Sequence, residues 1–217
     1  VGKDANGMPY YSEADVQAAA HVLTGYRITS SSVTSYFDPT RHDTANKQFS
    51  AFYSNTIITG QSGPNGALEL DALLNMIFAT NQVALFICRK LYRFFVYYEI
   101  DAAAEANVIV PLANIFRTNN YNILPVLTTL LSSEHFYDVL NRGCIIKAPL
   151  DVNVAFCKDY GVVFPDASSN LAGQYNMWYK LHQQNVLQNQ SIGDPPPVVG
   201  WPAYYQDPNF HELWINT

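Results

Sequence analysis

Apolar residues recur at helical spacing along most of this 217-residue chain. After Ala67, for example, Leu70, Leu73, Leu74 and Ile77 fall three or four positions apart, which places them on one side of a helix. The same spacing, together with local start and stop residues, predicts further helices. In chain order the predicted helices cover residues 13–23, 67–79, 82–98, 111–118, 123–131, 149–161 and 169–188.

Several helix ends are marked by residues suited to them. Ser12 followed by Asp15 resembles a capping box, although Asp is a weaker partner there than Glu or Gln. Gly25 and Gly161 are suitable stops. Proline tolerates the first helical turn because its missing N–H has no intrahelical partner there. Three prolines are predicted to occupy first turns: Pro111, Pro125 and Pro149.

One part of the chain departs from helical periodicity. Residues 27–37 are rich in β-branched and hydroxyl residues, and we expect them to pair as a short strand with part of 47–58. Residues 59–66, "TGQSGPNG", form a loop by their glycine and proline content. The predicted fold is therefore mainly α, a multi-helical orthogonal or bundle-like domain with a small β-hairpin near residues 27–58. We expect a single helical domain over residues 1–217.

Composition narrows the classes of function. Charged residues make up only 14% of the chain, against roughly 25% in ordinary soluble domains. The net charge is −6 and the 12 Lys and Arg residues form no basic run, so we expect no nucleic-acid partner. No apolar run approaches the ~20 residues that span a bilayer, so we expect no transmembrane segment in this chain.

The three cysteines have no metal-like spacing. Cys88 and Cys157 lie in apolar helical patterns, where a free cysteine behaves as a small buried hydrophobe, and Cys144 lies between helices. Three residues do not define a disulfide, so the redox state of the set stays open. We predict no metal site and no cofactor.

The stretch "FDPTRHDTANKQF", residues 37–49, contains the first candidate site. It places His42 beside Asp43, with Lys47 four positions later. An Asp–His hydrogen bond would brace the loop, and the same residues would also suit substrate binding or acid–base catalysis. A metal site of the His–Asp phosphohydrolase type would need helical delivery and a further histidine such as His21, but the doublet follows a proline in a loop. We therefore expect bracing, with the Asp43 carboxylate facing an arginine.

Two other groups of residues are candidates. Arg89 and Arg93 are i,i+4 neighbours that would either clamp an anion or pair with carboxylates such as Asp43, Glu99 or Asp151. In the proline-rich segment 191–210, Trp201 would be either a stacking platform for a sugar or a proline-rich peptide, or a buried plug, and we expect the plug. Tyr204 and Tyr205 add to the aromatic density there and keep the binding interpretation open. Neither a G-x-S-x-G elbow nor a phosphate-binding glycine loop is present.

Five stretches, in order, resemble a known bacterial family. They are "YSEADVQAAAHVLTGY", "FDPTRHDTANKQF", "ALFICRKLYRFFVYYE", "IIKAPLDVNVAF" and "DPPPVVGWPAYYQDPNFHELWINT". The set resembles domain-of-unknown-function family 1800, and "GWPAYYQ" is most similar to its Bacteroidetes branch. The resemblance implies a mainly helical fold and a chain that is the central to C-terminal portion of a longer domain.

The resemblance also implies a cellular location, but it implies no reaction. Similar proteins often carry secretion signals and are encoded near a sulfatase-like family, which implies a periplasmic or extracellular location. The leading hypothesis is an uncharacterised exported binding or scaffold module of the cell envelope, linked to polysaccharide or sulfated-glycan handling, with a sulfatase-like protein or a glycan as partner. The alternative is a hydrolase-like enzyme with a site around His42, Asp43, Lys47, Arg89 and Arg93.

Overall fold

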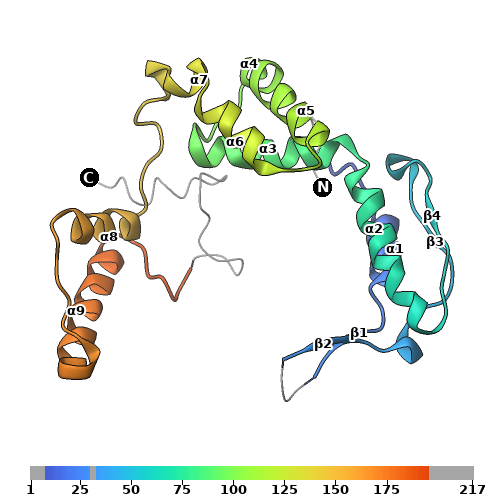
Figure 1. Cartoon of the computed structure of the whole chain (residues 1–217), viewed down its shortest axis with the longest axis horizontal. Helices are drawn as coiled ribbons and strands as arrows, with labels where there is room; N and C mark the ends of the chain where they lie inside the picture. The colour runs from blue at the N-terminus through green and yellow to red at the C-terminus, as the bar shows by residue number, and fades with distance from the viewer. Residues whose placement is uncertain (1–7, 30–32, 196–217) are drawn as a thin grey trace. The chain divides into compact units, whose positions relative to one another are not determined.

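The computed structural model describes residues 8–29 and 33–195, and Figure 1 shows their helices and strands in chain order. The chain divides into two compact units. Unit 1 comprises Val1–Cys88 and Ala113–Asn122, and unit 2 comprises Arg89–Leu112 and Ile123–Thr217. The described part is mainly helical with only short strands, which confirms the predicted fold class.

Unit 1 combines helices with short strands and 3-10 turns. Its elements are α1 (Glu13–Val22), β1 (Tyr26–Ile28), β2 (Ser35–Phe37), η1 (Pro39–Arg41), β3 (Lys47–Gln48), η2 (Ala51–Tyr53), β4 (Ile57–Ile58), η3 (Gly63–Ala67), α2 (Leu68–Phe78) and the first half of α3 (Asn81–Phe95). Helix α1 contacts both α2 and β3. Its apolar core is a cluster of buried side chains: Ala18, Val22, Phe49, Tyr53, Ile58, Leu73 and Met76.

The strands pair differently from the prediction. Residues 27–37 were expected to pair with part of 47–58, but β1 pairs antiparallel with β2, and β3 pairs antiparallel with β4. Each strand therefore pairs with a near neighbour in the chain, which closes a shorter loop and costs less chain entropy. The second hairpin is closed by backbone bonds such as that from Asn55 N–H to the Ser50 carbonyl, 2.9 Å.

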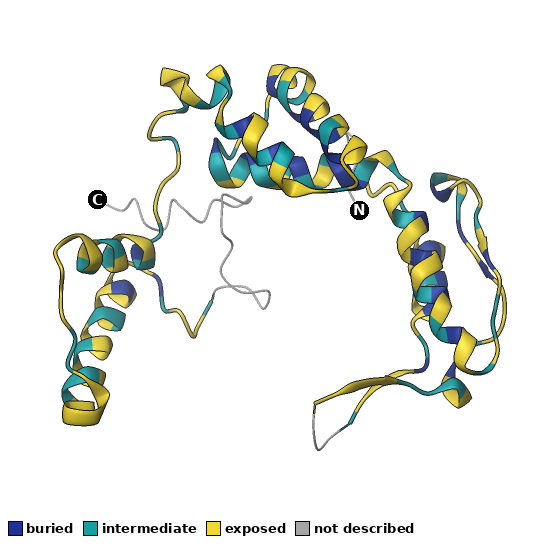
Figure 2. Ribbon diagram, in the orientation of Figure 1, coloured by how far each residue is buried: buried dark blue, intermediate teal, exposed yellow. Residues whose placement is uncertain are grey.

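Unit 2 is built from helices. Its elements are the second half of α3, α4 (Ala102–Ala104), the π-helical turn η4 (Glu105–Ile109), the start of α5 (Val110–Thr118), α6 (Ile123–Leu131), α7 (Glu134–Tyr137), η5 (Val139–Asn141), α8 (Pro149–Asp159) and α9 (Ala167–Leu187). Buried residues concentrate on the segments from α3 to α6, whereas α8 and α9 are mostly exposed or half-buried (Figure 2).

The helix around Pro111 begins earlier than the sequence suggested. Asp101 caps it by accepting a hydrogen bond from the Ala104 N–H, 2.7 Å, and helical structure then runs through α4, η4 and α5. Pro111 therefore lies inside a helical stretch and not at its start. Because proline lacks the N–H that would bond to the carbonyl four residues earlier, the wider π-turn directly before it adjusts the backbone at this point.

Among the residues described, no single helix is long and apolar enough to cross a membrane. Residues 63–78 and 81–95 reach the required length and apolar composition only as a pair, and this pair is bent.

The three cysteines are free. Cys88 is fully buried, as its pattern predicted, and burial raises the pKa of its thiol to about 12. Cys157 is only half-buried.

The buried carboxylate of Asp15 joins the start of α1 to the β3–β4 hairpin. It completes a capping box with Ser12 and also accepts hydrogen bonds from the backbone N–H and the hydroxyl of Ser50, at 2.7 and 2.8 Å. Burial by itself raises the pKa of this carboxyl, but the donors from Ser12 and Ser50 outweigh it and hold the pKa below its ordinary value.

Replacing Asp15 by alanine therefore removes more than a helix cap. We expect Asp15→Ala to lower the free energy of unfolding by about 2 to 3 kcal/mol, because the cap is lost and the Ser50 donors become unsatisfied. Glu13→Ala, at an exposed position in the same turn, should change it by less than about 0.5 kcal/mol. Equilibrium denaturation in urea measures both, and equal losses would contradict this role of Asp15.

Candidate functional site

His42, Lys47 and Glu69 form a buried polar cluster in unit 1. Their side chains are 1%, 2% and 1% exposed. The Glu69 carboxylate lies 2.9 Å from His42 Nε2 and accepts a hydrogen bond from Lys47 Nζ at 2.7 Å. It also accepts one from the backbone N–H of Gln61, 2.7 Å. Two of the sequence candidates thus meet around a third residue that the sequence analysis did not select.

Local structure explains how these side chains reach one another. Glu69 lies in the first turn of α2, His42 directly follows the proline-initiated turn η1, and Lys47 begins β3. Turns η1 and η3 are in contact, which brings the His42 ring against Gly66. A Cβ at Gly66 would lie 2.6 Å from His42 Cδ2, so only glycine leaves room for the ring.

Both nitrogens of the His42 ring face oxygen acceptors. Nδ1 lies 2.9 Å from the Thr24 carbonyl, and Nε2 faces the Glu69 carboxylate. The Thr24 hydroxyl also lies 3.3 Å from Nδ1, so protein oxygens occupy both edges of the ring. The Thr24 hydroxyl adds a contact by accepting from the Asp43 N–H, 2.8 Å.

The protonation of Glu69 follows from its donors. Burial by itself raises the pKa of the carboxyl. Hydrogen bonds from His42, from Lys47 and from the Gln61 backbone outweigh that effect, so the pKa lies below its ordinary value of 4.5. The cluster is therefore held together by an ionised carboxylate under ordinary conditions.

The Asp43 carboxylate pairs with a histidine that is not part of this cluster. Its carboxylate lies 2.5 Å from His21 Nδ1, and the two side chains are 29% and 58% exposed. The expected arginine partner was wrong: the carboxylate is part-exposed and faces α1, whose last turn supplies His21. The pKa of Asp43 lies below its ordinary value mainly because the Ala45 N–H donates to the carboxylate. Desolvation raises the pKa, but the hydrogen bond with His21 lowers it further. Lys47 Nζ also donates to the Asp43 carbonyl.

The arginine pair lies in unit 2. Arg89 donates to Glu105 through Nε and Nη2, the closest approach being 2.5 Å, so it pairs with a carboxylate on the neighbouring π-turn that the sequence analysis did not name. Arg93 Nε donates to the Tyr98 carbonyl, 3.1 Å. The structure brings His42, Asp43 and Lys47 together in unit 1 and places the two arginines in unit 2.

The remaining candidates are the aromatic residues of the proline-rich segment. Trp201, Tyr204 and Tyr205 lie outside the described residues. Within residues 8–29 and 33–195, no group of three or more His, Cys, Asp or Glu side chains is arranged to hold a metal ion.

Glu69 is the residue that sequence reasoning missed. A signal for it existed, because Glu69 precedes Leu73 by four positions and Met76 by seven, and both are buried core residues. An acidic residue in register with the apolar face of a helix needs a buried partner. The sequence could indicate that need, but nothing local identified His42 and Lys47 as the partners.

Comparison with known proteins identifies the family. The family model described as protein of unknown function (DUF1800) matches residues 1–217, the whole chain. The chain belongs to the DUF1800 family. Neither the curated proteins nor the solved structures give a match to this DUF1800 chain.

Neutralising Glu69 tests whether the cluster braces the DUF1800 fold. We expect Glu69→Gln to lower the free energy of unfolding by about 3 to 5 kcal/mol, because the buried Lys47 ammonium then lacks its counter-charge. Asp71→Asn is the matched control, since it makes the same change at an exposed position of α2 and should cost less than about 0.5 kcal/mol. Equilibrium denaturation at neutral pH compares them, and a Glu69→Gln protein as stable as the control would rule out a bracing role.

The same carboxylate predicts an acid dependence. A lowered pKa in the folded state means that Glu69 contributes stability above its unfolded value of 4.5, and that this contribution is lost as pH falls toward the folded pKa. Between about pH 7 and about pH 3, the unfolding free energy of the parent should therefore fall more steeply than that of Glu69→Gln. Urea titrations at several pH values measure both slopes, and parallel curves would contradict the assignment.

Proposed function

We propose that this DUF1800 chain is a binding or scaffold module of the cell envelope, exported to the periplasm or the exterior, that holds polysaccharide for a sulfatase-like partner. The observation that carries the proposal is the exposed aromatic surface of α9. The location and the partner rest on the family resemblance, and the glycan rests on the chemistry of that surface.

The aromatic surface consists of Tyr175, Trp178 and Tyr179. Their spacing of three and four residues places them on one side of α9, and they are 59%, 47% and 58% exposed. The rings of Tyr175 and Trp178 meet edge to face with centroids 5.5 Å apart. Helix α8 contacts α9, and the rings of Phe156 on α8 and of Tyr160 directly after it are also exposed.

Such a surface suits a sugar chain. An aromatic ring offers a flat apolar face to the C–H side of a sugar, while the Tyr hydroxyl and the Trp indole N–H are polar groups at the edge. Exposed amides on the same helix, including Asn176 and Gln183, can exchange hydrogen bonds with sugar hydroxyls. Lys158 on α8 and Lys180 on α9 are exposed cations available to a sulfate group.

The hydrolase alternative receives less support. It requires His42 and Lys47 to reach a substrate, but both side chains are enclosed and already bonded to Glu69. Arg89 is likewise engaged by Glu105. These contacts give the charged residues a bracing role, which favours a binding module over a catalyst.

Removing the central ring tests the proposal. We expect Trp178→Ala to weaken binding to a soluble polysaccharide by about five- to tenfold, because one stacking face is lost. Phe94→Ala removes an aromatic side chain of similar exposure, 52%, from α3 and should leave the affinity unchanged. Titration calorimetry against neutral and sulfated polysaccharides measures the affinities, and circular dichroism verifies the fold. A parent chain that binds none of them would exclude the glycan assignment.

A further inference from the structure

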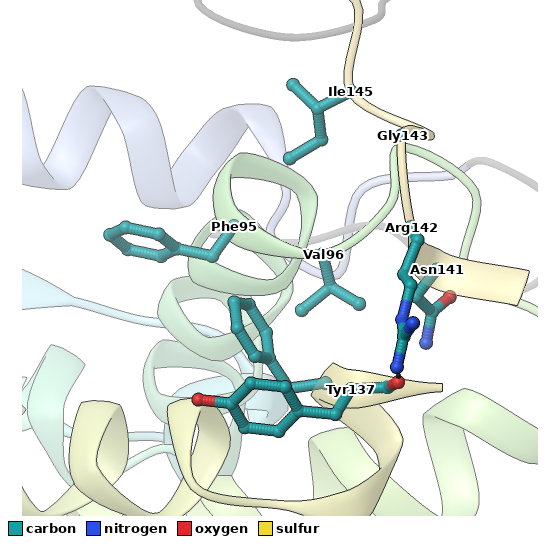
Figure 3. Close-up of a pocket in the computed structure, with 8 residues that line it drawn as sticks. Phe95, Val96, Tyr137, Asn141, Arg142, Gly143 and Ile145 are labelled. Atoms are coloured by element: carbon teal, nitrogen blue, oxygen red, sulfur yellow. Dashed lines mark hydrogen bonds between the residues drawn. The ribbon is translucent and has the colours of Figure 1, made fainter. Parts of the chain in front are cut away.

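A pocket of about 380 Å³ lies in unit 2 between the end of α3 and the segment that follows α6. Figure 3 shows it, with Phe95 at the left, Arg142 at the right, Val96 between them and Tyr137 below. Pockets of this size accommodate small molecules. The lining residues are Phe95, Val96, Phe136, Tyr137, Asn141, Arg142, Gly143 and Ile145.

Most of the lining is apolar. Val96 is 2% exposed, so it forms part of the floor, and the rings of Phe95 and Phe136 add broad apolar surface. Ile145, which is partly exposed, lies toward the rim. A ligand that fills such a space gains free energy mainly from its apolar body.

Two polar side chains are fixed beside this apolar surface. Arg142 Nε donates to the Tyr137 carbonyl, 3.3 Å, and Asn141 Nδ2 donates to the His135 carbonyl, 2.6 Å. In the part of the chain that the structure describes, the Arg142 guanidinium forms no ion pair with a carboxylate. This contrasts with Arg89, whose charge is matched by Glu105. The two terminal nitrogens of Arg142 therefore retain donors for a ligand.

From this combination we infer that the pocket binds a small organic anion, with an apolar aromatic or acyl body and a single sulfate, carboxylate or phosphate head. The body occupies the surface formed by Phe95, Val96 and Phe136. The head meets Arg142, whose planar guanidinium suits oxygen anions of this kind. Asn141 supplies an amide oxygen that can accept a hydrogen bond from the ligand. This site is independent of the glycan surface on α9, and neither proposal requires the other.

Two fluorescent probes with the same apolar body test the inference. 1-Anilinonaphthalene-8-sulfonate carries an anionic head, and N-phenyl-1-naphthylamine lacks it. With the full chain, we expect Arg142→Gln to lower the affinity for the sulfonate probe by about fivefold and to leave the affinity for the neutral probe unchanged. Arg142→Lys keeps the charge and should restore part of the affinity. Arg27→Gln, which makes the same change at an exposed position of β1 in unit 1, should affect neither probe.

The outcomes separate this pocket from other apolar surfaces. If Trp178→Ala lowers the affinity for the sulfonate probe and Arg142→Gln does not, the probe binds on α9 and the inference fails. Equal weakening of both probes by Arg142→Gln would also overturn it, because the effect would then not depend on the anionic head. A naphthalene carboxylate tested beside the corresponding sulfonate shows whether the pocket distinguishes the two heads. Preference for either one supports an anion site, and an affinity for both that is insensitive to Arg142→Gln opposes it.

Discussion

Unit 1 depends on the ionised carboxylate of Glu69. This group is taken out of water, which is unfavourable unless every lone pair finds a donor. Its donors come from three separate segments: His42 after η1, Lys47 at the start of β3 and the Gln61 backbone before η3. All three segments precede α2 in the chain and have little regular structure of their own. Fixing them to one helical side chain therefore defines how the irregular region folds against α2.

Asp15 acts in a similar way on the same hairpin. It binds Ser50, just beyond β3, while Glu69 binds Lys47 within that strand. The β3–β4 hairpin is only two residues long on each side, and a pair of strands so short is not stable alone. The two carboxylates hold it against α1 and α2, and the apolar cluster that includes Phe49 and Ile58 fills the space it covers. Polar anchoring and apolar packing are thus interdependent here.

The sequence predicted the ranges of the helices better than it predicted which distant residues and strands contact one another. Helical spacing and caps such as Ser12 with Asp15 are local signals, so α1, α2, α8 and α9 lie close to their predicted ranges. Pairing between distant residues has no local signal. His42 and Glu69 are 27 positions apart, and Asp43 bonds to His21 on a preceding helix and not to an arginine. The strand pairing failed for the same reason, since β-branched composition indicates a strand but does not specify its neighbour.

The two units differ in how their reactive side chains are used. In unit 1 the titratable side chains of the candidate site bond to one another. His42 and Lys47 both bond to Glu69, and Asp43 pairs with His21. A side chain committed to such contacts is a poor candidate for meeting a substrate, whatever its residue type. In unit 2 the rings of Tyr175, Trp178 and Tyr179 are about half exposed, and among residues 8–29 and 33–195 the guanidinium of Arg142 forms no ion pair with a carboxylate. Unit 1 is therefore fixed by buried charge, and the two binding sites that we propose both rest on aromatic and cationic groups that unit 2 exposes.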